Sequence, residues 1–389
     1  MEKILEKAES IENYIIDVRR DFHQHPELSG AEFKTQQKIM EELDKLGISY
    51  VKAGNASLIA SIKGEKSGKV VALRGDMDAL PIIEQSGLEF SSKVSGVMHG
   101  CGHDAHTAML LGAAKLLSEM KSEINGEIRF FFQEAEETFK GAKEIIKAGG
   151  MEAVDACFGM HGLPTIKTGF VNIQEGYRLS GCDTIFVKFE GISGHGSTPH
   201  LAKDTIHPAC VFVSNLQSIV TKNINAQEPI VLSVGKFTGG TKANIVAQFT
   251  ELDISMRYFD PSARKIVHEA IKRHAKAIAD GYEIKAEVVI EESTLSTYND
   301  GELSAIASKA AAEVLGDDKN VAMPRQMASE DFSYFLKYAK GVYALVGFGN
   351  EEKGSVYPPH NEKFKIDEDY LKYGTALYSQ FALDFLNKI

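Results

Sequence analysis

Few features of the sequence point to a specialised class of protein. It has no tryptophan, only four cysteines, and no apolar run close to the roughly 20 residues that span a bilayer. The cysteines form neither a CxxC redox pair nor a paired zinc knuckle, and they are too few to cross-link a chain of 389 residues. The charged, helix-periodic N-terminal segment lacks the apolar core of a signal peptide. We therefore expect no membrane partner and a reducing, cytoplasmic location.

Basic residues are in the minority. Lysine and arginine number 43 against 54 aspartates and glutamates, which gives a net charge of −11. An acidic surface disfavours nucleic acid and anionic membranes as partners. Apolar residues make up 43% of the chain, an ordinary share for a globular protein, and a chain of this length usually divides into two domains.

The spacing of apolar residues predicts an α/β domain. Helical periodicity covers roughly the first 45 residues, and a clear helix is predicted from about 104 to 120. Short, continuously apolar runs such as 70–73 alternate with helical segments, and the last run, 340–349, precedes a final helix at 367–387. This alternation is typical of a mostly parallel sheet with helices on both faces.

A second pattern interrupts the first. Between about 178 and 292 the predicted order is strand, helix, strand, strand, helix, strand, with one strand over 244–259. This is the split β-α-β-β-α-β arrangement, which is complete in itself. We therefore expect a ferredoxin-like α+β domain at 179–292, inserted into a larger domain formed by 1–178 and 293–389.

Acidic and imidazole side chains gather where the predicted strands end. Asp76 and Asp78 follow one strand, Glu136 and Glu137 follow another, and His161 follows a third. In open α/β sheets, ligands bind beyond the carboxyl ends of the strands. These groups are therefore expected to converge on one crevice.

The segment His99–His106 packs three imidazoles, a thiol and a carboxylate into eight residues before a helix. Its glycines allow a tight turn around a ligand, and metal coordination would deprotonate the thiol. The alternative is a helix cap with a buried free cysteine and solvated histidines.

The Glu136–Glu137 pair offers two roles. One carboxylate can hold a metal ion while its neighbour acts as a general base, because adjacent side chains of an extended segment point to opposite sides. Such a pair is usually a solvated helix start, but here it follows an apolar strand. His161 and His360 are weak signals when taken alone.

Eight motifs occur in order along the chain: RGDMDALPI, MHGCGHDAHTAMLLGAA, FFQEAEET, GMHGLP, SGHGSTPH, GGTKANIVA, SEDFSYF and PPHNEKF. Together they resemble the metallopeptidase family that includes aminoacylases and bacterial carboxypeptidases. Within it, the chain is most similar to the amidohydrolase subgroup of hippurate hydrolases, indole-acetyl-amino-acid hydrolases and N-acetyl-diaminopimelate deacetylases. The resemblance extends from about Arg19 to the C-terminus.

The resemblance implies a centre with two divalent metal ions per subunit. The implied ligands are Cys101, His103, Glu137, His161 and His360. Cys101 would bridge the ions where other branches have Asp, Glu136 would be the general base, and Asp78 would orient a ligand. Zn, Mn, Co and Ni all suit this ligand set.

Two positions depart from the wider family. Asp76 stands where other branches have His, a change that the subgroup shares, and Glu134 stands where the subgroup often has Pro. We expect the latter to affect loop rigidity and not chemistry.

The resemblance also assigns residues to the inserted domain, which would act as a lid and dimerisation domain. His195 would stabilise the tetrahedral oxyanion, commonly in the site of the partner subunit of a homodimer. Asn244 and Arg257 would line the same face, and an arginine suits a bidentate grip on a substrate carboxylate. The alternatives are a turn residue for Asn244 and a strand-surface charge for Arg257.

Structural roles are predicted for other histidines and cysteines. His106 is expected to anchor the helix behind His103, His268 to be solvated, and His274 to pack on the apolar stripe of its helix. The segment HQHPE predicts a helix stop. Small buried apolar positions are expected for Cys157, Cys182 and Cys210.

The predicted function is metal-dependent hydrolysis of the acyl amide of N-acyl amino acids (N-acetyl, benzoyl or similar aryl-acyl) by an activated water. The alternative is a dipeptidase or carboxypeptidase with the same dinuclear site. A non-catalytic binding protein that kept the fold would be favoured if Glu136 or a ligand were missing, and none is. A structural metal site fits poorly because such sites are closed and four-coordinate.

Overall fold

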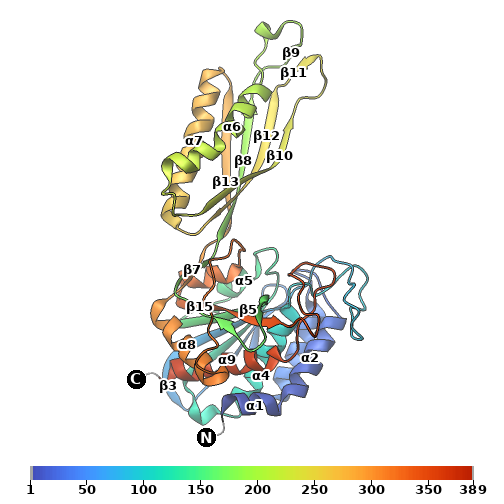
Figure 1. The fold of residues 1–389 in the computed structure, drawn as a ribbon, viewed down its shortest axis with the longest axis vertical. Coiled ribbons are helices and arrows are strands. Elements are labelled where there is room, and N and C mark those ends of the chain that lie inside the picture. The colour runs from blue at the N-terminus through green and yellow to red at the C-terminus, as the bar shows by residue number, and fades with distance from the viewer. Residues whose placement is uncertain (1–2, 388–389) are drawn as a thin grey trace. The chain divides into compact units, whose positions relative to one another are not determined.

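The computed structural model describes residues 3–387, which form two compact units (Figure 1). Unit 1 contains the chain up to Gly176, Tyr298–Pro324 and the chain from Asp331 onward. Unit 2 contains Tyr177–Thr297 and Arg325–Glu330. The sequence proposed boundaries at 178/179 and 292/293, with residues 325–330 in the larger domain.

Unit 1 is the α/β domain. Its elements are α1 (Ile4–Ser10), α2 (Glu12–Gln24), α3 (Phe33–Lys45), β1 (Ser49–Ala53), β2 (Ser57–Lys63), β3 (Lys66–Asp76), α4 (His103–Ser118), η1 (Lys121–Glu123), β4 (Asn125–Gln133), α5 (Gly141–Lys147), β5 (Ala156–Lys167), β6 (Val171–Asn172), α8 (Gly301–Leu315), η3 (Asp331–Lys337), β15 (Lys340–Gly349) and α9 (Tyr370–Leu386). The sheet order is β1-β2-β4-β3-β5-β15-β6. The four central strands are parallel and the flanking ones antiparallel.

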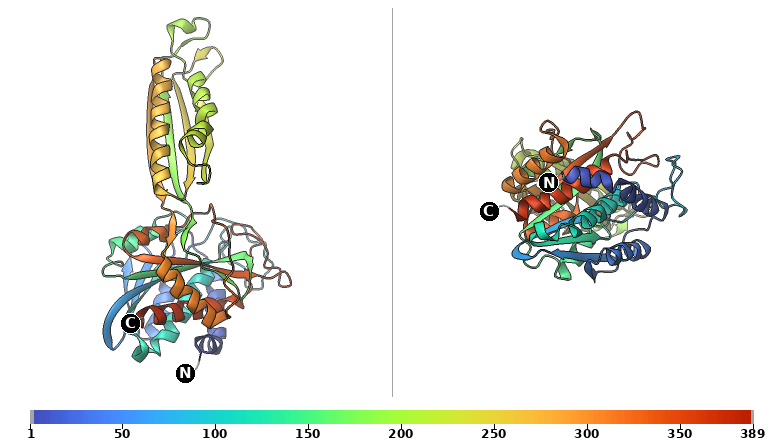
Figure 2. Two further views of the ribbon diagram at one scale, coloured as in Figure 1. Left: turned by 60° about the vertical axis from the view of Figure 1, so that its left-hand side comes forward. Right: turned by 90° about the horizontal axis from the view of Figure 1, so that it is seen from below.

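Both faces of this sheet are covered, because its central strands carry apolar side chains on both sides. Phe158 of β5 stacks on Phe381 of α9, with ring centroids 4.4 Å apart. Phe131 of β4 meets Phe335 of η3 at 5.3 Å. The helices around the sheet can be followed in Figure 2. The predicted fold class is confirmed, although α8 and β1 were not predicted.

Unit 2 is the α+β domain. Its elements are β8 (Gly181–Glu190), β9 (Gly194–His195), η2 (Pro199–Leu201), α6 (Ile206–Asn223), β10 (Ile230–Gly239), β11 (Ile245–Val246), β12 (Phe249–Tyr258), α7 (Pro261–Gly281) and β13 (Lys285–Thr294). Two short strands, β7 (Gly176–Leu179) and β14 (Thr297–Asn299), lie where the chain passes between the units.

The four-stranded sheet of unit 2 has the order β10-β12-β8-β13, and all of its neighbours are antiparallel. Helices α6 and α7 pack side by side and share a core with the sheet. The single strand expected over 244–259 is divided into β11 and β12. Within residues 3–387, no helix is long and apolar enough to cross a membrane.

Candidate metal centre

The carboxyl ends of neighbouring strands bring the predicted polar residues together in unit 1. Strand β3 pairs with β4 so that Asp76 lies opposite Gln133. Asp78 and the Glu136–Glu137 pair therefore leave the sheet side by side, and β5, on the other side of β3, carries His161. The side chains converge, as expected from the sequence, because β4, β3 and β5 are neighbours in the sheet.

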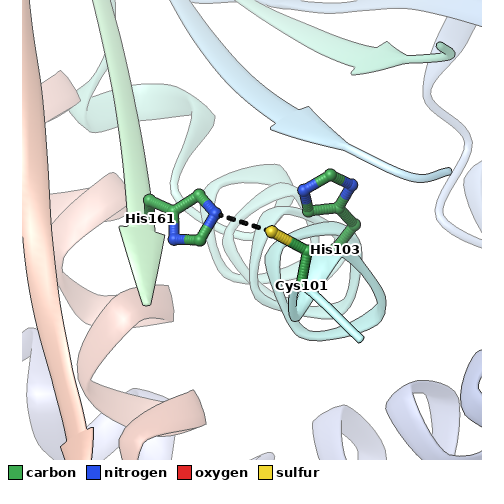
Figure 3. A group of neighbouring side chains, drawn as sticks. All are labelled: Cys101, His103 and His161. Atoms are coloured by element: carbon green, nitrogen blue, oxygen red, sulfur yellow. Dashed lines mark hydrogen bonds between the residues drawn. The ribbon is translucent and has the colours of Figure 1, made fainter. Parts of the chain in front are cut away.

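The start of α4 adds a thiol and an imidazole to the same edge. The N-cap Gly102 has φ 90°, in the left-handed region, and places Cys101 and His103 on either side of a sharp turn. A Cβ at Gly102 would meet no atom nearer than 3.6 Å, so the backbone conformation and not space calls for glycine. Figure 3 shows the Cys101 thiol between the rings of His161 and His103, with Sγ 3.3 Å from His161 Nε2.

The ring of His103 is oriented from behind by Asp78. His103 Nδ1 lies 2.9 Å from Asp78 Oδ1, while Asp78 Oδ2 accepts hydrogen bonds from Ser29 Oγ and the Glu137 amide. Among residues 3–387, the buried His103 Nε2 has no hydrogen-bond partner. A buried ring nitrogen without a partner is costly, but a carboxylate-oriented imidazole with one free nitrogen is the usual form of a metal ligand.

The five predicted ligands form two overlapping groups. Ligand atoms of Cys101, His103 and His161 all lie within 4.8 Å of one another, and so do those of Cys101, Glu137 and His360. The thiol belongs to both groups. His360 Nε2 is 3.2 Å from Glu137 Oε1, and its backbone N–H donates to the carbonyl of Gly100, next to the thiol.

Glu136 lies beside the two groups. It comes within the same 4.8 Å limit of His103 and Glu137, and its Oε1 accepts the backbone N–H of Asp331 at 3.4 Å. A carboxylate in this position can exchange a proton with a molecule held at the ligand cluster.

Burial disfavours the charged forms of two of the ligands, Cys101 and His161. It raises the pKa of the Cys101 thiol to about 12 and lowers the pKa of His161 to about 3. Burial also disfavours the charged form of His103, but nearby Asp76, Cys101 and Asp78 outweigh it and raise its pKa. A divalent cation would deprotonate the thiol, so occupancy and thiolate formation are coupled.

A third group of possible metal ligands contains Asp76, His103 and His106. His106 is not available to a metal ion, because both of its ring nitrogens make other contacts. His106 Nδ1 is 2.6 Å from Asp76 Oδ1, and His106 Nε2 accepts the backbone N–H of Gly162. Both ring nitrogens are engaged, so His106 ties α4 to β5 behind the ligands, as predicted.

Sequence reasoning missed the buried ionic network beneath the site. Arg74 donates to Asp76 at 2.6 Å and to Asp331 at 2.9 Å, and Gln133 also donates to Asp331. Asp331 lies in the SEDFSYF motif, but the only signal there was the motif itself, since Arg74 is 257 positions away in the chain.

A second missed network lies at the N-terminal helices. Arg19 of α2 donates to Asp104 of α4 at 2.7 Å, and buried His23 lies between Asp104 and Glu84. Helix α2 ends at Gln24, so the helix stop predicted at HQHPE is present, but His23 is a buried ionic partner and not simply part of a turn.

Unit 2 brings together only two of its three predicted site residues. His195 of β9 pairs with Ile245 of β11, and the carbonyl of Asn244 accepts the N–H of Gly196. His195 is exposed, and its Nδ1 is 2.7 Å from Ser197 Oγ. His195 and Asn244 both lie beyond the end of the sheet at which β8 ends with Glu190 and β12 begins with Phe249.

Arg257 lies at the opposite end of the sheet. It pairs with Cys182 at the start of β8, and its Nη1 donates to Ser329 Oγ at 2.5 Å. The expectation that Arg257 lines one face with His195 and Asn244 does not match the geometry of unit 2, because β12 separates them along most of its length.

Two structural expectations were wrong. His268 is not solvated, because its Nε2 lies 2.7 Å from the buried carboxylate of Asp183, which faces it across the sheet–helix interface. Cys210 is exposed, whereas Cys157 and Cys182 are buried as expected. His274 is only partly buried on α7.

The chain has close relatives among known proteins. Residues 72–384 match the model of the Peptidase family M20/M25/M40. The chain is 38% identical to thermostable carboxypeptidase 2 of Saccharolobus solfataricus, over 100% of this chain and 99% of the relative. It is 36% identical to N-acetylcysteine deacetylase of Bacillus subtilis, over 96% and 97%. A solved Bacillus subtilis structure, described as a dinuclear metal binding peptidase, superposes with a TM-score of 0.88 at 33% identity and covers 98% of this chain and 99% of that one.

Proposed function

Because the chain belongs to the Peptidase family M20/M25/M40 and is a hydrolase of amide bonds, we propose that it cleaves the acyl amide of N-acyl amino acids with two divalent metal ions. The family resemblance carried by the motifs is thereby confirmed. The observation that carries the proposal is the thiol of Cys101, which belongs to two ligand groups at once, with Glu136 beside them.

Two ions fit the residues that are present. Cys101, His103 and His161 would hold one, and Cys101, Glu137 and His360 the other. The buried His103 Nε2, which makes no hydrogen bond within residues 3–387 and lies 3.7 Å from Asp76 Oδ2, and the buried thiol are the groups that a cation would satisfy. Bound ions would polarise the amide carbonyl and lower the pKa of the attacking water. The mixed S, N and O ligands suit Zn, Mn, Co or Ni.

The chain's own residues divide the remaining work. Glu136 accepts the proton of the attacking water and returns it to the leaving amine. The N–H of Asp331 fixes the direction of that carboxylate. Asp78 holds the His103 ring and the Glu137 backbone in place at the same time.

N-acyl amino acids are the proposed substrates because the curated relatives include an N-acetylcysteine deacetylase. The second candidate is a dipeptidase or carboxypeptidase, favoured by the carboxypeptidase relative. In either case Arg257 would grip the substrate carboxylate in place of its hydrogen bond to Ser329.

Unit 2 is proposed to act as a lid and dimerisation domain. The chain enters and leaves unit 2 at the end of the sheet where Cys182 pairs with Arg257 and Thr294. His195 and Asn244 lie roughly 30 Å away, at the other end of the ten-residue β8. This separation favours a homodimer in which His195 stabilises the oxyanion in the partner's site, with closure hinging near Arg178 and Glu292.

The four free cysteines agree with the proposed cytoplasmic location.

A hydrolysis panel tests the proposal. N-acetyl, N-benzoyl and indole-acetyl amino acids and several dipeptides would each be assayed with Mn, Zn, Co and Ni. We expect the acyl amino acids to be cleaved with the higher kcat/KM. Cleavage of dipeptides alone would favour the second candidate, and no cleavage with any metal would refute both.

A further inference from the structure

The loop that carries Glu136 and Glu137 is held by side chains. The N–H of Glu134 donates to Ser57 Oγ at 3.1 Å, and the N–H of Glu137 donates to Asp78 Oδ2 at 3.0 Å. Between them, the N–H of Ala135 donates to Glu32 Oε1 at 2.8 Å. Three side chains from outside the loop therefore decide its path.

Ala135 has an unusual backbone conformation. Its φ is 53°, in the left-handed region that residues with a Cβ seldom adopt, and it directly precedes Glu136. Such a conformation persists only where the surroundings impose it, and it clusters at functional sites. Any relaxation of Ala135 would rotate the following residue and redirect its carboxylate.

Glu32 is the group that meets this strained residue. It is the N-cap of α3, yet its side chain does not cap that helix. Its carboxyl is fully buried and accepts a hydrogen bond from the N–H of Ala135, which is 103 positions away in the chain. Burying a carboxyl group is costly unless it makes a specific interaction. None of the steps assigned to the metal ligands, Asp78 or Glu136 uses Glu32.

We propose that Glu32 is a positioning residue, which holds Ala135 in the left-handed conformation and thereby aims Glu136 at the metal centre. The hydrogen bond from the N–H of Asp331 fixes the other end of the same residue, at its carboxylate. Glu136 is thus held from both its backbone and its side chain. This inference rests on the proposed role of Glu136 as the general base.

Two variants test the hydrogen bond. Glu32→Ala removes the acceptor, and we expect kcat to fall by about ten- to hundredfold, the usual effect of a misplaced catalytic group, with KM and metal content within about twofold of wild type. Glu32→Gln keeps an acceptor of the same length, so most of the kcat should remain. A Glu32→Ala enzyme with wild-type kcat would overturn the proposal.

A rescue separates positioning from general stability. Glycine adopts positive φ freely, so Ala135→Gly added to Glu32→Ala should restore kcat at least severalfold. Ala153→Gly is the matched control, because Ala153 also has a φ of about 56° but lies at an exposed turn away from the loop. Equal rescue by both glycines would show a stability effect and refute positioning.

A crystal structure of the metal-loaded Glu32→Ala variant tests the positioning role of Glu32 without relying on the role of Glu136 in catalysis. We expect Ala135 to leave the left-handed region and Glu136 to turn away from His103. An unchanged φ at Ala135 would overturn the inference. Glu136→Gln, assayed in parallel, reports on the general base alone: full activity there would refute the proposed role of Glu136 and leave the structural result to decide the role of Glu32.

Discussion

Glu136 is the residue whose replacement should separate chemistry from metal binding. Glu136→Gln keeps the size of the side chain and an acceptor for the N–H of Asp331. We expect kcat to fall by about two decades or more, the usual contribution of a general base, with metal content unchanged. Steady-state kinetics and elemental analysis of the same preparation measure both quantities.

Glu134→Gln is the matched control, because this neighbouring carboxylate accepts the N–H groups of Asn55 and Ala56 and lies outside the ligand groups. Its kcat should stay near wild type. Near-wild-type turnover of metal-loaded Glu136→Gln would remove Glu136 from the role of base.

The thiol of Cys101 is the second residue-scale test. A hydroxyl is a far poorer anionic bridge than a thiolate, so Cys101→Ser should weaken metal binding. Since loss of even an outer partner of a ligand costs about 10–100-fold in affinity, at least that loss is expected here. Chelation should abolish wild-type activity, and added divalent metal should restore it.

Cys157→Ser provides the control, since Cys157 is also a buried thiol but lies outside the ligand groups. It should lower thermal stability without changing metal affinity. Equal metal affinities of Cys101→Ser and wild type, measured by competition with a chelator, would make Cys101 a bystander.

At the scale of elements, a buried ionic cluster around Asp183 joins strand β8 to helix α7 in unit 2. Buried Asp183 of β8 accepts two hydrogen bonds from Arg264 at 2.8 Å and lies 2.7 Å from His268 Nε2. Burial alone would raise the pKa of Asp183, but the contacts with His268 and Arg264 outweigh it and lower the pKa. The carboxylate is therefore stabilised in the folded state.

The lowered pKa of Asp183 predicts that the stability of unit 2 falls in acid. Because the folded pKa of Asp183 is below the unfolded value of about 3.9, its contribution is present above about pH 4 and is lost as the pH falls through the folded pKa. Asp183→Asn should lower the free energy of unfolding by about 2 kcal/mol at pH 7, and the gap to wild type should shrink below pH 4. Urea unfolding at a series of pH values measures it.

Asp253→Asn on the same sheet is the comparison, because Asp253 makes only a partly exposed ion pair with Lys236 at 3.5 Å. Its effect should be within about 0.5 kcal/mol at every pH. If the difference in the free energy of unfolding between Asp183→Asn and wild type stays constant between pH 7 and pH 3, the assigned pKa shift is contradicted.

At the scale of the whole molecule, the test is complementation between two inactive chains. His195→Ala is expected to lose most of its kcat with metal retained, because an oxyanion donor is worth about 10²–10³-fold. If His195 acts in the partner's site, mixing it with Glu136→Gln creates dimers in which one site has both groups. Part of the activity should then return, and sedimentation should show a dimer.

Subunit exchange must be shown with differently tagged chains, so that a failure to recover activity is informative. No recovery despite proven exchange would exclude the action of His195 across subunits. Wild-type turnover of His195→Ala would exclude the oxyanion role altogether.

Much of the fold was predictable because its signals are local. The strand expected before Glu136 and Glu137 is β4, which meets α9 on one side and η3 on the other. The boundaries of β15 match the expected run 340–349. Helix α8 was missed, and the strand expected over 244–259 is two strands.

The motifs located the candidate ligands and two of the groups behind them, Asp78 and His106, but not the buried networks of Arg74 and Arg19. The sequence alone determined most of the strands and helices and which of them end in metal-binding chemistry, because side-chain period and turn residues act over a few positions. Only the tertiary structure decided that Asp183 meets His268 and that Glu32 holds Ala135. Those pairings depend on strand order and on the packing of helices against the sheet, which bring together residues about a hundred positions apart that no local pattern relates.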